Sequence, residues 1–149
     1  MNLDVCREIL HSENLTCVAA DESGILLKSG KKGILPMLDV LDLYQNQNGR
    51  PVYQADRIIG KAAIIIAAHC GIREIYADVI SDSAWGIALY KGIKVIYRDK
   101  VEMILDRTGT REGPFEAALH DVDTDDFGLV MKTIYETLDS MGIPYGKQS

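Results

Sequence analysis

The stretch from Ile75 to Tyr97 reads IYADVISDSAWGIALYKGIKVIY and carries the clearest structural pattern of the chain. Its start is rich in β-branched and aromatic residues, so residues 74–80 are predicted to form a strand. Residues 82–91 are predicted to form a short helix that ends at Gly92, because a left-handed glycine commonly follows a helix. Residues 93–97 favour a strand again. This order indicates parallel strands joined by a right-handed crossover.

The segment before this unit, residues 56–70, is predicted to be a long helix with Asp56 as its N-cap. It is apolar on all sides in its middle, which is typical of a helix packed against a sheet. Nearer the N-terminus, residues 15–20 and 25–29 are predicted to pair as a β-hairpin. The remaining predicted elements are helices at 2–12, 34–44, 99–107, 114–119 and 127–141, loops at 45–54 and 108–113, and a frayed tail at 142–149.

Length and composition indicate one ordinary globular domain. The chain has 149 residues, of which 47% are hydrophobic and 26% charged. The formal net charge of −6 disfavours general binding to nucleic acid, because an acidic protein repels phosphate backbones. No apolar run approaches the ~20 residues that a membrane-spanning helix needs, and the N-terminus lacks the pattern of a secretory signal. We therefore expect a cytoplasmic protein without a membrane partner.

The usual residues of metal and redox sites are scattered. The three cysteines, Cys6, Cys17 and Cys70, have no paired spacing, which argues against a disulfide framework and against the commonest zinc motifs. The histidines are far apart in sequence, so no helical metal clamp is present. Gly60-Lys61 lies outside any phosphate-loop pattern, because position 55 and position 62 are both alanine. We predict no cofactor and no metal ligand.

The predicted order of elements resembles the cytidine deaminase-like fold. The resemblance implies a three-layer α-β-α domain over residues 1–149, with a mixed sheet, an N-terminal hairpin, parallel strands and extra C-terminal helices. In zinc deaminases this stretch of chain carries the metal ligands and a catalytic glutamate. The corresponding positions here are occupied by Gly60, Ala62, Asp82, Ser83 and Gly86. Zinc needs three protein ligands, so the resemblance implies a protein that is not a zinc-dependent deaminase.

A closer resemblance rests on several motifs together. The motifs are LDVLDLY at 38–44, DRIIGKAA at 56–63, Gly109-Thr110, and GPFE at 113–116. They are similar to an uncharacterised prokaryotic family known as domain of unknown function eighteen-ninety-three, over roughly residues 2–119. That family is grouped with the deaminase-like fold and likewise lacks the zinc ligands. The resemblance implies the fold and leaves the activity open.

Polar residues at the starts of two predicted helices, and in the loop that follows, are the candidate binding residues. Helix starts with free N–H groups favour an anion or a polar ligand, and such loops often contact ligands. The candidates are Asp56 and Lys61 at the first start, Ser81, Asp82 and Ser83 at the second, and Arg107, Thr110 and Glu116 in or after the loop. The same residues also fit a structural role as caps, with Lys61 exposed and Glu116 near a helix start.

Three functions remain open on this evidence. The first is a non-catalytic pocket for a small polar or nucleotide-like ligand. The second is a metal-free enzyme that uses Lys61 and a nearby carboxylate as acid and base. The third is a structural or homo-oligomeric module, with Trp85 and the apolar final helix as its interface.

Overall fold

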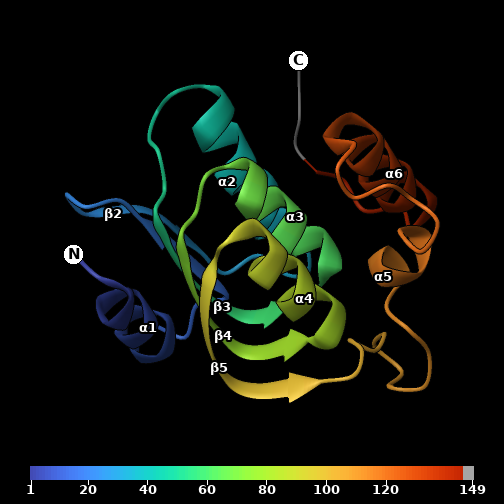
Figure 1. The fold of residues 1–149 in the computed structure, drawn as a ribbon, viewed down its shortest axis with the longest axis horizontal. Coiled ribbons are helices and arrows are strands. Elements are labelled where there is room, and N and C mark those ends of the chain that lie inside the picture. The colour runs from blue at the N-terminus through green and yellow to red at the C-terminus, as the bar shows by residue number, and fades with distance from the viewer. Residues whose placement is uncertain (146–149) are drawn as a thin grey trace.

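Five strands form one mixed sheet in the order β2-β1-β3-β4-β5 in the computed structural model, which describes residues 1–145 (Figure 1). The strands are β1 (Cys17–Ala20), β2 (Ile25–Ser29), β3 (Tyr53–Ile59), β4 (Glu74–Ser81) and β5 (Lys94–Val101). Strand β1 is antiparallel to both β2 and β3, whereas β3, β4 and β5 are parallel to one another. The predicted hairpin and the predicted parallel strands are confirmed.

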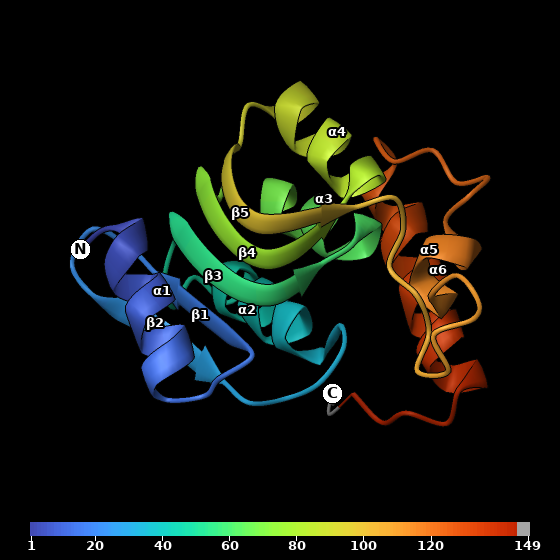
Figure 2. The ribbon, with the colours of Figure 1, turned by 90° about the horizontal axis from the view of Figure 1, so that it is seen from below.

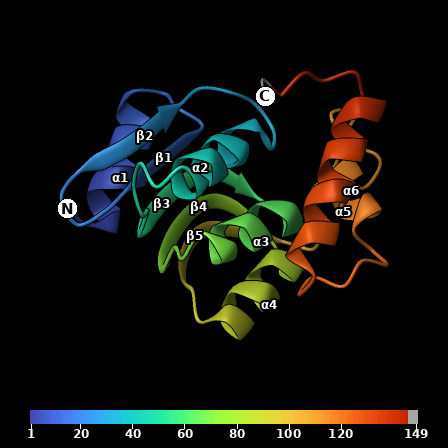
Figure 3. The same ribbon diagram turned by 90° about the horizontal axis from the view of Figure 1, so that it is seen from above.

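Helices cover both faces of the sheet, as Figure 2 and Figure 3 show. One face carries α1 (Leu3–Ser12), and the other carries α2 (Leu35–Gln45), α3 (Lys61–His69) and α4 (Asp82–Lys91). Two further helices, α5 (Pro114–Ala118) and α6 (Phe127–Ser140), lie beyond the carboxyl ends of β3, β4 and β5. The three-layer α/β class and the extra C-terminal helices are confirmed. Within residues 1–145, no helix is long and apolar enough to cross a membrane.

Strand β1 shows how the sequence separates two cores. Its four residues are all buried, but they alternate between the faces of the sheet, as side chains on a strand must. Cys17 and Ala19 pack into the large core beneath α2 and α3. Val18 and Ala20 pack with the apolar face of α1 in the smaller core. Strand β1 is therefore apolar throughout, with no polar alternation, as is typical of a strand buried on both faces.

The predicted helix at 56–70 is wrong in its first part. Residues Tyr53–Ile59 form β3, the central strand, and the helix begins at Lys61 with Gly60 as its N-cap. Asp56 is therefore a strand residue and caps nothing, and the predicted 45–54 loop ends earlier than expected. The sequence YQADRII does not look like a buried strand, because it contains charged and amide side chains whose partners lie in distant parts of the chain.

The predicted helix at 99–107 is also wrong. Strand β5 continues to Val101, since its pairing with β4 extends as far as Ser81. Residues 102–113 form an irregular segment closed by a bridge between Leu105 and Glu112. The tail differs too, because Ile143 and Tyr145 pack against the core and do not fray. The rest of that prediction falls on residues 146–149, outside the described residues.

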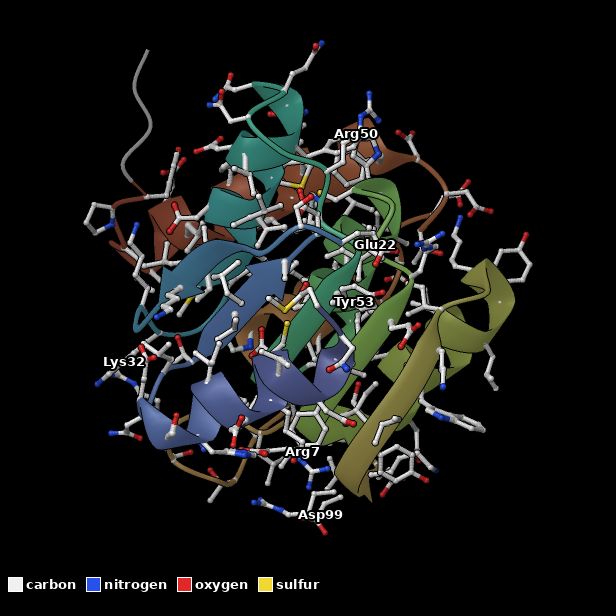
Figure 4. The ribbon with its side chains drawn as sticks, turned by 90° about the vertical axis from the view of Figure 1, so that its left-hand side faces the viewer. Arg7, Glu22, Lys32, Arg50, Tyr53 and Asp99 are labelled. Carbon is white, nitrogen blue, oxygen red and sulfur yellow. The ribbon has the colours of Figure 1, made fainter. Side chains whose placement is uncertain are left out.

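A buried carboxylate fastens α1 to the sheet. Asp78 of β4 is 5% exposed and accepts hydrogen bonds from the Tyr76 hydroxyl (2.6 Å) and the Arg57 guanidinium (3.1 Å), with His11 Nε2 at 2.8 Å. Burial acts to raise the pKa of Asp78, but these hydrogen bonds outweigh it and hold the pKa below its usual value. Arg7 of α1, labelled in Figure 4, lies over the Tyr76 ring at 4.5 Å.

Replacing Asp78 tests this attachment. Asp78→Ala leaves Arg57 and Tyr76 without their acceptor, so we expect a loss of about 3 kcal/mol in the free energy of unfolding, measured by urea denaturation. The control is Asp99→Ala, which breaks an exposed pair with Arg98 and is expected to cost less than about 1 kcal/mol. Equal losses in the two variants would contradict a special role for Asp78.

Candidate ligand-binding cleft

A cleft of about 810 Å³ lies at the carboxyl end of β3, between the sheet and the C-terminal helices. The position follows from the topology, because β3 has an antiparallel neighbour on one side and a parallel one on the other. Open α/β sheets bind ligands at the carboxyl ends of their strands, beside such a change of direction. The far wall comes from the start of α2, the 104–107 and 113–116 segments, and the end of α6.

Asp56 lies at the buried side of this cleft. It is 8% exposed, and it accepts hydrogen bonds from Gln54 Nε2 (3.2 Å), the Ile58 amide (3.2 Å) and the Cys17 thiol. Burial outweighs these bonds and raises the pKa of Asp56 to about 7. Burial also raises the pKa of Cys17 well above its ordinary value, so this thiol stays protonated. Asp56 therefore presents a carboxyl group that changes charge near neutral pH.

The walls of the cleft are largely apolar. Ile58 and Leu105 line it and remain 53% and 47% exposed, although most large apolar side chains of the chain are buried. Exposed apolar side chains that gather in a concavity are typical of a ligand-binding site. The other apolar lining residues are Ile34, Leu35, Pro36, Ile104, Phe115, Leu138, Met141 and Ile143.

Four cationic side chains line the cleft, but two of them are already engaged. The Arg57 guanidinium bonds Asp78 and the carbonyls of Leu15 and Leu10. Lys61 Nζ donates to the Leu119 carbonyl at 3.1 Å. Lys32 and Arg107 are exposed, and neither forms an ion pair within the described part of the chain. These two side chains are available to an anionic group.

The predicted binding residues separate into three groups. Asp56, Lys61, Arg107 and Glu116 line the cleft together. Ser81 and Ser83 lie behind its wall, where both bond Glu116. The structure places the other two outside the cleft lining. Asp82 pairs with Lys100 at 2.8 Å, and Thr110 bonds Thr108 at 2.6 Å on an exposed turn.

The apolar half of the lining was not predicted, because no local pattern distinguishes an exposed apolar residue such as Ile58 from a buried one. Of the apolar residues of the final helix, Val130, Ile134 and Leu138 pack inside the core, whereas Leu129 is 41% exposed. Trp85 is half-buried with Lys100 Nζ over its ring at 5.2 Å. A homo-oligomer remains a prediction.

The residues at the positions where the deaminase resemblance would place a metal do not fit a zinc ion. Gly60 and Gly86 supply no ligand atom, and Ser83 donates its hydroxyl to Glu116 at 3.1 Å. A side chain at position 60 would collide with the same carboxylate, since a Cβ there would lie 2.8 Å from Glu116 Oε1. Within residues 1–145, no three His, Cys, Asp or Glu side chains converge as a metal site.

The raised pKa of Asp56 predicts how stability depends on pH. The folded state binds more protons at Asp56 than the unfolded state between about pH 4 and pH 7, so the contribution of Asp56 to stability falls as pH rises through this range, by up to about 1.4 kcal/mol per pH unit. Asp56→Asn removes this slope.

Thermal denaturation from pH 4 to pH 8 checks this expectation, with exposed Asp82→Asn as the control. We expect Asp56→Asn to be more stable than the wild type at pH 8, and the control to keep the slope of the wild type. An unchanged slope in Asp56→Asn would show that another group titrates.

Comparisons with known proteins agree on the family. The family model described as "Domain of unknown function (DUF1893)" matches residues 5–136, most of the chain. The crystal structure of a DUF1893 family protein from Thermotoga maritima is similar, with a TM-score of 0.77 and 20% sequence identity. The match covers 90% of this chain and 88% of that one. A search of curated proteins finds no match. The chain belongs to the DUF1893 family of domains of unknown function.

Proposed function

We propose that this chain is a small-molecule binding domain whose cleft takes a nucleotide-like ligand, with a flat apolar body, a hydrogen-bonding edge and an anionic group. The observation that carries the proposal is the buried carboxyl group of Asp56 in a cleft of about 810 Å³ whose walls are largely apolar. Ligand sites of this kind combine apolar walls with a few well-placed polar groups.

Asp56 supports a hydrogen-bonding edge on the ligand. A carboxyl group with a pKa of about 7 offers an acceptor when ionised and a donor when protonated. The ring nitrogens and amino groups of a heterocyclic base match both states. The neighbouring Ile58 supplies an exposed apolar surface on which the flat ring can pack.

Lys32 and Arg107 support an anionic group at the open side of the cleft. Lys32 lies on the loop that leads into α2, labelled at the edge of the molecule in Figure 4. Arg107 lies across the cleft, on the segment between β5 and α5. A phosphate or carboxylate bound by these side chains would retain access to water, which keeps its desolvation cost low.

The deaminase-like relationship is part of this proposal. The strand order β2-β1-β3-β4-β5 and the helices at the starts of the two crossovers agree with that resemblance. Two of the three positions that would hold the metal, Gly60 and Ser83, lie against the carboxylate of Glu116, and the third is Gly86. We infer a domain that retains the position of the deaminase cleft and not its chemistry.

A metal-free enzyme is the second candidate, and Asp56 favours it more than Lys61 does. A buried carboxyl group with a pKa near 7 beside a cleft is suited to general acid–base catalysis. Lys61 has its ammonium group on the Leu119 carbonyl, and no carboxylate within the described residues pairs with that ammonium.

Two matched substitutions test the binding proposal. Ile58 and Leu89 are both exposed apolar residues, at 53% and 59%, but only Ile58 lines the cleft. Saturation-transfer NMR with cytidine monophosphate, adenosine monophosphate and naphthoate identifies a bound probe. We expect Ile58→Asn to weaken its affinity about tenfold, through loss of apolar contact, and Leu89→Asn to leave it unchanged. Equal effects of the two variants, or no binding of any probe, would refute the proposal.

Metal analysis tests the chemistry that the proposal excludes. We expect freshly purified protein to contain no stoichiometric zinc, and its melting temperature to be the same with and without EDTA, because the metal positions offer no ligand set. One tightly bound zinc per chain, with a lower melting temperature after chelation, is the contrary result.

A further inference from the structure

Glu116 is a buried carboxylate without a cation beside it. It is 8% exposed, and it takes part in no ion pair within residues 1–145. Burying such a group is costly unless hydrogen bonds replace the lost water. Three donors replace it here. Oε1 accepts from the Lys61 amide (2.8 Å) and the Ser81 hydroxyl (3.2 Å), and Oε2 accepts from the Ser83 hydroxyl (3.1 Å).

These donors belong to the starts of two helices. The amide of Lys61 is the first of α3, and Ser81 and Ser83 flank the start of α4. Each helix start carries partial positive charge, so a carboxylate between them is stabilised from both sides. Helix α3 has no side-chain cap of its own, because its N-cap is Gly60. Glu116 supplies that cap from 55 residues away.

The chain leaves room for this carboxylate at Gly60. The backbone of Gly60 is extended, with φ −103° and ψ −174°, so any residue could adopt its conformation. The constraint is the close approach, because a Cβ at this position would lie 2.8 Å from Glu116 Oε1. A Cβ at position 60 would therefore force the Glu116 carboxylate to shift away from the starts of α3 and α4.

Glu116 is carried by α5, which forms part of the outer wall of the cleft together with Gly113 and Phe115. The segment before α5 is bonded largely to itself, as by the bond from the Gly113 amide to the Ile104 carbonyl at 2.8 Å. Besides Glu116, the α5 region is held by Leu119, which is buried in the large core and accepts a bond from Lys61 Nζ at its carbonyl. We propose that Glu116 is an intramolecular latch. Its hydrogen bonds to the starts of α3 and α4 hold α5 and residues 102–113 over the cleft.

The latch would regulate access to the cleft. Ile104, Leu105 and Arg107 lie on the segment that it fastens, so its release would remove one wall and one cation from a bound ligand. This consequence rests on the proposed function, whereas the latch itself rests on the contacts of Glu116 alone.

Hydrogen exchange and acetate binding test the latch. We expect Glu116→Ala to lower the melting temperature by about 5 °C and to speed amide exchange in residues 102–119, with β3 and β4 unaffected. Sodium acetate should restore part of the melting temperature, because a free carboxylate can occupy the position that the Glu116 carboxylate has left. Sodium chloride at equal ionic strength should not restore it. The control is Glu112→Ala, on the same segment, whose carboxylate bonds exposed His120 and should show neither effect.

A double-mutant cycle keeps the test valid if Glu116→Ala alone is poorly folded. Gly60→Ala should destabilise the wild type through its clash with Oε1, and should cost clearly less in the Glu116→Ala background. Glu116→Gln, which retains the acceptor for the Lys61 amide, should lie between the wild type and Glu116→Ala.

Two results would contradict the latch, even if the wild type binds cytidine monophosphate. One is an equal destabilisation by Gly60→Ala in both backgrounds, and the other is unchanged amide exchange across residues 102–119 in Glu116→Ala. If the wild type binds none of the probes but the cycle is non-additive and the segment loosens, the latch stands and the proposed function fails.

Discussion

The carboxylate of Glu116, held between the starts of α3 and α4, is the contact on which the arrangement of the cleft depends. It joins the C-terminal part of the chain to both crossovers of the parallel sheet. The two helix starts meet because β3, β4 and β5 are parallel, so each strand delivers its following helix to the same edge. Their combined positive ends would otherwise face an apolar cleft without a partner.

The rest of the site follows from where β3 lies. As the central strand, it has side chains buried on both faces, and the polar ones must find partners there. Asp56 faces the large core, where Cys17 and Gln54 bond it, and its tip reaches the cleft. Arg57 faces α1 and bonds Asp78. One strand thereby supplies both the attachment of the N-terminal helix and the polar floor of the cleft.

The crossover at 74–92 was predictable because its signals are local. An apolar strand, a serine at the helix start and a left-handed Gly92 are each typical of the element that forms. Strand β3 was not, because Gln54, Asp56 and Arg57 look like the polar start of a helix until their distant partners are known. The predicted end of β5 was too early for a related reason. The last residues of this strand are charged, and charges are common on an exposed edge strand.

The candidate site was predicted in its polar half. Asp56, Lys61 and Glu116 were identified as residues near helix starts, and all three line the cleft. Their observed contacts differ from those expected of local helix caps, because each contact reaches across the fold. The cap that Glu116 provides to α3 joins residues 55 positions apart, a relation that no local pattern contains.

Gly60 and Ser83 both lie against Glu116, since Gly60 leaves space for its carboxylate and Ser83 donates a hydrogen bond to it. The proposed relation to deaminases would place metal ligands at these two positions. The most direct measurement is a crystal structure of the wild type grown with zinc, with anomalous data at the zinc absorption edge. We predict the Glu116 carboxylate in contact with the Lys61 amide and Ser83, and no anomalous peak between Gly60 and Ser83. A zinc peak at that position, with Glu116 displaced or acting as its ligand, would contradict the central claim.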